Sequence, residues 1–197
     1  MRLAAQGYRQ TDRMKAVPIQ IGQKKESDFT DPLGLLSDCH RRIEHFLAVL
    51  IRLSGRAERG SLDATETELL EKALTYFRNA APKHTADEER SLFPRMRASG
   101  RAEAPLARLA ELEHEHEVAA RDHEMVDVIA RRWLGEGKLT PEDSVQMTRA
   151  LERLSEIYRR HIAVEDNELF PLASQLLRPE ELAAVGREMA DRRGIKK

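Results

Sequence analysis

The pattern H-x-A-x-E-x-x-x-L-F-P occurs twice in this chain and constrains its fold more than any other feature. The two copies begin at His84 and His161. A single histidine precedes each copy at a matching distance, because His40 lies 44 residues before His84 and His116 lies 45 residues before His161. The chain is therefore predicted to consist of two related halves, each with one single histidine and one histidine–glutamate pair.

Apolar residues recur at intervals of three and four through both halves, which is typical of amphipathic helices. The dipeptides D-P at 31–32 and T-P at 140–141 are signals that start a helix, and Asp63 or Thr65 can cap another. No segment shows a sustained β alternation. We therefore predict an all-α fold, an antiparallel up-down-up-down four-helix bundle with a short fifth helix at the C-terminus.

Three parts are expected along the chain. Residues 1–28 are basic and have no sustained period, so they are predicted to be a flexible extension, within which Met14 is an alternative start. Residues 29–178 form the predicted bundle, and residues 179–197 form a short helix with a basic tail. Pro82 falls inside the second predicted helix and should kink it just before the first copy of the pattern.

The composition argues against several classes of protein. The formal net charge is −1, so we expect no nucleic-acid partner. No apolar run approaches the roughly 20 residues that span a bilayer, so no membrane association is expected. The N-terminus lacks the features of a secretory signal, and the single cysteine, Cys39, fits a reducing compartment. A cytoplasmic protein is therefore predicted.

Helix geometry predicts that the four histidines lie at one level of the bundle. If the first helix ends near residue 57 and the second begins near residue 65, His40 and His84 lie roughly 26 and 28 Å from the loop that joins them. The same arithmetic places His116 beside His161. The glutamate of each pair follows its histidine by four residues, so it shares the same face of its helix.

Six side chains are predicted to meet inside the bundle and to bind metal: His40, His84, Glu88, His116, His161 and Glu165. Unpaired, these groups would be costly to bury, whereas metal ions satisfy all of them at once. A structural zinc ion needs only four ligands. Six ligands favour two metal ions that each take two histidines and share both glutamates. Imidazole and carboxylate without thiolate suit iron, manganese or zinc.

In these residues the chain resembles the hemerythrin-like (HHE) family, whose pattern is one histidine, an HxxxE pair, a second single histidine and a second HxxxE pair on four successive helices. The six residues match this pattern in order, spacing and helix placement over about residues 32–177. The L-F-P that follows each pair is also similar to the family. The resemblance implies a cofactor of two non-haem iron ions joined by an oxo or hydroxo bridge.

Two positions depart from the oxygen-carrying members of that family. Those proteins have a further histidine one turn beyond the single histidine of the third helix, where this chain has Ala120. They also place the last carboxylate five residues after its histidine, which is Asp166 here. We prefer Glu165, because a spacing of four keeps the carboxylate on the inner face. The missing histidine argues against reversible oxygen storage.

Several further residues near the six were weighed for a role at the site. His123 is predicted to support or pack against the site, and Glu44 is a candidate for an additional ligand. Tyr158 is expected to pack in the helix face, with a phenol directed at the site as the alternative. His45 and His114 are predicted to lie at the surface, because their positions break the helical register.

Charged residues next to the predicted ligands are expected to be mainly solvated. The run LEHEHE is predicted to be a solvated helix surface apart from His116. Glu89 and Asp166 each follow a predicted ligand and are expected to be exposed, with hydrogen bonds to the ligands as the alternative.

Two functions from different classes remain open. The first is a di-iron protein that binds, senses or scavenges dioxygen, peroxide or nitric oxide. The second is an iron-dependent regulatory or interaction module, in which the metal is structural and the basic extension or the fifth helix contacts a second copy or another protein. A ferritin-like carboxylate enzyme is disfavoured, because that class uses Glu-x-x-His pairs.

Overall fold

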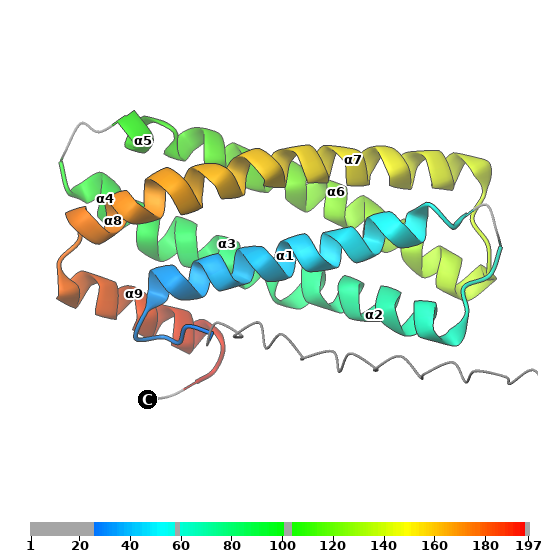
Figure 1. Ribbon diagram of the computed structural model, residues 1–197, viewed down its shortest axis with the longest axis horizontal. Helices are drawn as coiled ribbons and strands as arrows, with labels where there is room; N and C mark the ends of the chain where they lie inside the picture. The colour runs from blue at the N-terminus through cyan, green and yellow to red at the C-terminus, as the bar shows by residue number, and fades with distance from the viewer. Residues whose placement is uncertain (1–25, 58–59, 101–103, 196–197) are drawn as a thin grey trace, which may run out of the picture.

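The computed structural model describes residues 26–57, 60–100 and 104–195 (Figure 1). All regular secondary structure in these ranges is helical, so the predicted all-α class is confirmed. Most of the predicted basic extension, residues 1–25, lies outside the described residues, as do the last two residues of the predicted basic tail. Within the described ranges, none of the helices is both long enough and apolar enough to cross a membrane.

Within the described residues, the helices form four long stretches, at 32–54, 64–98, 104–136 and 141–176, and one separate helix that follows them. In chain order they are α1 (Pro32–Ser54), α2 (Ala64–Asn79), α3 (Ala81–Asp87), the π-helix η2 (Glu88–Leu92), α4 (Phe93–Ala98), α5 (Ala104–Ala107), α6 (Leu109–Glu136), α7 (Pro141–Val164), the π-helix η3 (Glu165–Leu169), α8 (Phe170–Leu176) and α9 (Pro179–Arg192).

The predicted capping residues start three of the long helices, α1, α2 and α7. The Asp31 carboxylate accepts a hydrogen bond from the backbone N–H of Gly34 at the start of α1. Asp63 forms a reciprocal pair of hydrogen bonds with Glu66 that starts α2, and Thr140 caps α7. These side chains satisfy N–H groups that have no partner inside the helix, which fixes where each helix begins.

The second helical stretch is interrupted near Pro82, as predicted. The helix α2 ends at Asn79, and α3 begins at Ala81 with Pro82 in its first turn. A proline is well tolerated there, because the N–H that it lacks has no intrahelical acceptor in the first turn. The interruption therefore lies just before His84.

Each copy of the pattern also contains a π-helical segment that the sequence analysis missed. The N–H of Phe93 donates to the carbonyl of Glu88, and the N–H of Phe170 donates to that of Glu165. The proline after each phenylalanine has no N–H, and its ring collides with the carbonyl four residues earlier. A widened turn before the proline is one way to relieve this collision, and such turns are frequent at functional sites.

The four long stretches lie side by side (Figure 1). The helix α1 packs against α2 and α7, and α6 packs against α2 and α7. Buried apolar side chains form two separate clusters, one around Leu50, Leu74 and Trp133 and the other around Leu36, Phe93 and Leu169. A layer of buried histidine and glutamate side chains lies between the two clusters along the helices.

The helix α9 packs on α1 and α3 of the same chain (Figure 1). Asp87, at the end of α3, is fully buried and pairs with Arg192 at 2.8 Å and with Arg193 at 2.7 Å. Gly186 lies against the backbone of Phe29, where an added Cβ would collide with the carbonyl oxygen of Phe29. A close backbone approach and buried ion pairs therefore hold α9 against the stretch that carries His84.

Candidate metal centre

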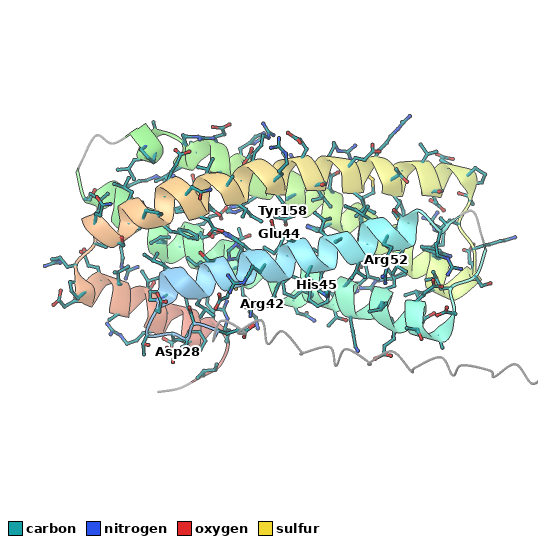
Figure 2. The ribbon with its side chains drawn as sticks, in the orientation of Figure 1. Asp28, Arg42, Glu44, His45, Arg52 and Tyr158 are labelled. Atoms are coloured by element: carbon teal, nitrogen blue, oxygen red, sulfur yellow. The ribbon has the colours of Figure 1, made fainter. Side chains whose placement is uncertain are left out.

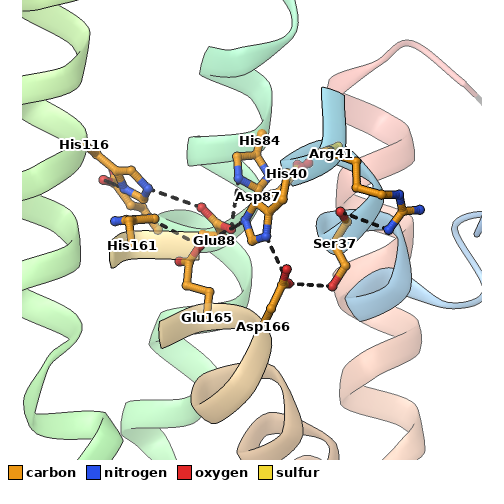
Figure 3. A network of polar contacts seen from close by, with 12 residues as sticks. Ser37, His40, Arg41, His84, Asp87, Glu88, His116, His161, Glu165 and Asp166 are labelled. Atoms are coloured by element: carbon orange, nitrogen blue, oxygen red, sulfur yellow. Dashed lines mark hydrogen bonds and ion pairs between the residues drawn. The ribbon is translucent and has the colours of Figure 1, made fainter. Parts of the chain in front are cut away.

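The structure brings all six predicted metal-binding side chains together (Figure 3). We call them the histidine–glutamate cluster, and every member is buried: His40 on α1, His84 on α3, Glu88 at the start of η2, His116 on α6, His161 on α7 and Glu165 at the start of η3. The two single histidines and the two histidine–glutamate pairs of the repeat therefore lie at one place in the fold.

The cluster divides into two groups of possible ligands that share both glutamates. One group adds His40 and His84 to the glutamates, and the other adds His116 and His161. Within each group, one nitrogen or oxygen atom from every residue lies within 4.8 Å of those of the others. Figure 3 shows the carboxylates between the two histidine pairs. This is the distribution predicted for two metal ions.

The carboxylate of Glu88 faces both groups at once. Its Oε1 lies 3.3 Å from Nε2 of His84, and its Oε2 lies 3.4 Å from Nε2 of His116. The carboxylate of Glu165 has a similar position: its Oε2 lies 3.0 Å from Nε2 of His40 and 3.2 Å from Nε2 of His161. Each glutamate therefore contacts one histidine of each group, as a bridging carboxylate must.

The polar atoms at the centre of the cluster fit a metal-binding role. Both carboxylate oxygens of Glu88 and of Glu165, and Nε2 of His40 and of His161, are buried without a hydrogen bond of good geometry. Burying such atoms without a partner is unfavourable. Metal ions between the two histidine pairs would supply the missing partners, and a set of imidazole and carboxylate donors suits iron.

Two of the histidines are oriented by the residue that follows a cluster glutamate. Nδ1 of His40 lies 3.0 Å from Oδ1 of Asp166, which also accepts a hydrogen bond from the Ser37 hydroxyl (Figure 3). Nδ1 of His116 lies 2.9 Å from Oε1 of Glu89. Such contacts fix the ring and the tautomer, so that Nε2 is presented to the metal. The expectation that Glu89 and Asp166 are mainly exposed is wrong, because both are half-buried and contact these rings.

Glu115 orients a third histidine and was missed by the sequence analysis. Its Oε2 lies 3.0 Å from Nδ1 of His161, and only 13% of its side-chain surface is exposed. The prediction of a solvated surface for LEHEHE apart from His116 is therefore wrong for Glu115. The helical period could have shown this, because Glu115 lies three residues after Leu112 and four before Ala119, both of which are buried.

His84 is the exception among the four histidines. Its Nδ1 is buried and has no hydrogen-bond partner. The repeat explains this difference: a shift of 76 positions lays His40 on His116, and it therefore lays Cys39 on Glu115. The first half of the chain thus has a thiol where the second half has the carboxylate that orients His161.

The pKa values of the metal-free histidines show the same asymmetry. Burial lowers the pKa of His116, but its contacts with the carboxylates of Glu88 and Glu89 outweigh burial and raise the pKa to about 10. For His161, the field of Glu165 and the hydrogen bond to Glu115 likewise outweigh burial, and the pKa is raised to about 9. Burial dominates at His84 and lowers its pKa to about 4.

The remaining candidates lie outside the cluster. Glu44 and His45 are exposed on α1 (Figure 2), so the structure gives no support to Glu44 as an additional ligand. His114 is exposed on α6, as predicted. Tyr158 is buried on α7, and its hydroxyl oxygen lies 2.9 Å from Nε2 of His123.

A cavity of about 450 Å³ adjoins the cluster and is lined in part by all four of its histidines. Its wall includes His123, whose ring stacks on Phe77 with a centroid distance of 4.0 Å. It also includes Ala120. The side chain of Ala120 is exposed, so the cavity reaches the surface near this residue.

Comparisons with known proteins show which family the chain belongs to. The hemerythrin HHE cation binding domain matches residues 31–173. An uncharacterized protein of Haemophilus influenzae is 27% identical over 168 residues, which cover 85% of this chain and 93% of that protein. Proteins named iron-sulfur cluster repair protein YtfE, from Pectobacterium carotovorum subsp. carotovorum and Pectobacterium atrosepticum, are each 30% identical over 171 residues, 83% of this chain and 74% of theirs. The chain therefore belongs to the hemerythrin HHE cation binding family and is a metal-binding, hemerythrin-like protein.

Proposed function

We propose that this protein holds two non-haem iron ions and binds, senses or scavenges dioxygen, peroxide or nitric oxide. The observation that carries the proposal is the pair of ligand groups that share Glu88 and Glu165. Two histidines and both glutamates would hold each ion. The proposal includes the antiparallel up-down-up-down order of the four helical stretches that the sequence predicts.

The chain's own residues would hold and orient the ions, and bound iron would supply the redox chemistry toward small oxygen- or nitrogen-containing molecules. Glu88 presents one oxygen to each ligand group, which suits a bridge between two cations. The carboxylates of Asp166, Glu89 and Glu115 hold three imidazoles in position from behind. These contacts keep Nε2 of each ring directed at the metal.

Access to the cluster supports sensing or scavenging rather than storage. The cavity connects the histidines with the exposed Ala120, so a small molecule can approach from the side of α6. A further histidine at this position, as in oxygen carriers, would fill part of this path. We infer that the reduced centre reacts with dioxygen in air and does not hold it reversibly.

The names of two relatives favour a second, related candidate function. Both are called iron-sulfur cluster repair proteins, and each is similar over 83% of this chain. A role in the repair of iron–sulfur clusters would use the same metal centre and the same small oxidants as stress signals. Restoration of activity to an oxidised [4Fe–4S] dehydratase by the iron-loaded protein, compared with free iron at equal concentration, tests this candidate.

The interaction-module function is distinguished from the first by the reactivity of the centre. In that function the iron is structural, and the basic extension or α9 contacts a partner, either a second copy of the chain or another protein. We also propose a cytoplasmic location. A structural centre should show no spectral response to small ligands. A reactive centre should show charge-transfer bands that change with azide, peroxide or nitric oxide.

Metal analysis with visible spectroscopy tests the proposed function. Protein produced with adequate iron should contain about two iron atoms per chain and should show ligand-dependent absorption bands after oxidation in air. A ratio near one, or zinc alone, would contradict the dinuclear proposal. Stopped-flow mixing of the reduced protein with oxygen should show irreversible oxidation, whereas oxygen uptake that reverses on degassing would favour a carrier.

A further inference from the structure

The cavity beside the cluster extends far beyond the metal-binding atoms. It begins at the cluster histidines and continues past Phe77 to Leu50, Leu74 and Val126. On α3 and α2, His84 and Leu74 are ten residues apart, which corresponds to roughly 15 Å along the bundle. The cavity is therefore an elongated space that runs from the metal layer into the apolar core, and not a pocket around the metals alone.

The volume exceeds what the proposed small ligands need. Dioxygen, peroxide and nitric oxide are comparable in size to one or two water molecules. An apolar cavity of about 150 Å³ is enough to hold benzene, and this cavity has about 450 Å³. Pockets of about 300–1,000 Å³ are typical of sites for organic ligands. The size of this cavity therefore points to an organic molecule.

The deep wall of the cavity is apolar and carries no charge. Ile43, Leu50, Leu74 and Val126 line it and are almost fully buried in the core. Such a wall gives water few hydrogen-bond partners, so displacing water by an alkyl chain is favourable.

One polar pair interrupts this wall, His123 and Tyr158, and the two residues face each other at 2.9 Å. Burial lowers the pKa of His123 to about 4. Burial also raises the pKa of Tyr158. Both side chains are therefore neutral near pH 7 and satisfy each other, so the middle of the cavity has no free charge to repel an alkyl chain.

The opening of the cavity lies between α2–α3 and α6. Pro82, Ala120 and Glu124 are exposed members of its lining. Beside them, Arg78 on α2 pairs at 2.6 Å with Asp127 on α6, so an ion pair bridges the two helices at the opening. Because Ala120 carries only a methyl group, the path from this opening to the cluster is not blocked by a side chain at that position.

We propose that the cavity binds a medium-chain organic monocarboxylate of about ten to fifteen non-hydrogen atoms, a size that follows from roughly 30 Å³ per water-sized group. The carboxylate lies at the metal centre, and the alkyl chain lies along Phe77 toward Leu50 and Leu74. A carboxylate oxygen is a suitable ligand for such ions, so the head group would complete the coordination that the protein residues leave open. This inference rests on the proposed metal site, whereas the apolar part of the cavity is independent of it.

Chain-length dependence tests the inference directly. Isothermal titration calorimetry of the metal-loaded protein, with its metal content measured, would compare acetate, hexanoate and decanoate. Each buried methylene contributes about 0.8 kcal/mol, or roughly a fourfold gain in affinity. Decanoate should therefore bind on the order of a hundredfold more tightly than hexanoate. Equal affinity for the three acids in protein of full metal content would overturn the inference and leave the di-iron proposal standing.

A matched pair of variants locates the binding. Ala120→Trp places a large side chain at the opening and should weaken decanoate binding at least tenfold. Ala110→Trp lies on the same helix, is also exposed and does not line the cavity, so it should bind decanoate like the wild type. Metal content should be unchanged in both. Equal decanoate affinity in the two variants would overturn the inference.

Metal-free protein separates the two proposals further. Without metal, the preference for decanoate over hexanoate should persist, because it arises from the apolar wall, while the affinity for both acids should fall. Protein that never binds two metal ions would refute the di-iron centre. The chain-length series would still show whether the apolar wall binds an alkyl chain. Decanoate affinity that is unaffected by metal would contradict the placement of the carboxylate at the cluster.

Discussion

The two ring nitrogens of each cluster histidine have different environments. Nε2 is directed at a buried glutamate in all four residues. Nδ1 meets a carboxylate in three of them and nothing in His84. A carboxylate behind the imidazole holds the ring in one orientation and increases its basicity as a ligand. The strength of each metal–histidine bond is therefore set by residues that do not touch the metal.

Removing a cluster histidine should release metal, and removing a surface histidine should not. His84→Ala and His161→Ala are each expected to lose at least one metal ion and to unfold at a lower temperature, because the buried glutamates lose their counter-charge. His45→Ala and His114→Ala are the controls, since both residues are exposed. Metal analysis and thermal denaturation measure the outcome; equal metal loss in all four variants would mean that the cluster is not the binding site.

His123 should make folding stability depend on pH. Its pKa is lowered to about 4 by burial, below the ordinary value of about 6.5. The unfolded chain therefore binds a proton more readily between these values, and the stability that is fully present above pH 6.5 is lost as the pH falls to about 4. The total loss is on the order of 3 kcal/mol.

Urea denaturation of the metal-free protein at several pH values would measure this dependence. His123→Phe should reduce the slope of this dependence between pH 6.5 and 4 and leave the part that His84 contributes, because the pKa of His84 is also lowered to about 4. Tyr158→Phe is the control, because it breaks the same hydrogen bond and keeps the imidazole. If the two variants lose stability equally as the pH falls, His123 is not the titrating group.

The sequence was sufficient to predict the six members of the cluster but not the residues behind them. The spacing of the repeat places these six side chains at one level of the bundle, and this result does not depend on how the helices pack. The helical period places Glu115 on the inner face with Leu112 and Ala119, but its contact with His161 depends on how α6 and α7 approach each other. Tertiary packing decides such contacts.

At the scale of the elements, the caps determined which boundaries could be predicted. Asp31, Asp63 and Thr140 satisfy N–H groups locally, so each start follows from a few neighbouring residues. The segments η2 and η3 were missed, because a proline in a helical pattern predicts a kink or an end and does not say which turn absorbs it. The structure places the widened turn immediately after each glutamate of the cluster.

The docking of α9 should depend on the absence of a side chain at Gly186. Gly186→Ala is expected to destabilise the protein by about 1–3 kcal/mol, because its Cβ would collide with the backbone of Phe29. Gly135→Ala is the matched control, since it lies in α6 with open space around it and should stabilise by about 0.5–1 kcal/mol. Chemical denaturation measures both; a Gly186→Ala variant as stable as Gly135→Ala would show that the contact with Phe29 is not held in solution.

At the scale of the whole molecule, the two halves of the chain supply matching parts to one centre. Asp166 of the second half supports His40 of the first, and Glu89 of the first supports His116 of the second. Neither half contains a complete set of ligands for one ion, because both glutamates belong to both groups. The sequence repeat predicted this sharing. The extent of the cavity could not be predicted, since it depends on how closely α2 and α6 approach.

The unsupported imidazole of His84 has a consequence for the exchange of metal with the surroundings. The group that contains His84 has one histidine backed by a carboxylate, and the group that contains His161 has two. Loss of such a partner typically weakens metal affinity tenfold to a hundredfold. The two ions should therefore leave one after the other when a chelator competes for them, with a fast and a slow phase of equal amplitude.

Glu115→Gln should speed up the slow phase of metal release, so that the rates of the two phases become similar. Glu117→Gln is the control, because it alters an exposed carboxylate beside His114 and should leave both rates unchanged. Release of both ions at a single rate from the unaltered protein would contradict this prediction. Two separate phases would mean that a form of the protein with a single bound ion is populated. In that form, the ion at His40 and His84 is the one that exchanges with the surroundings.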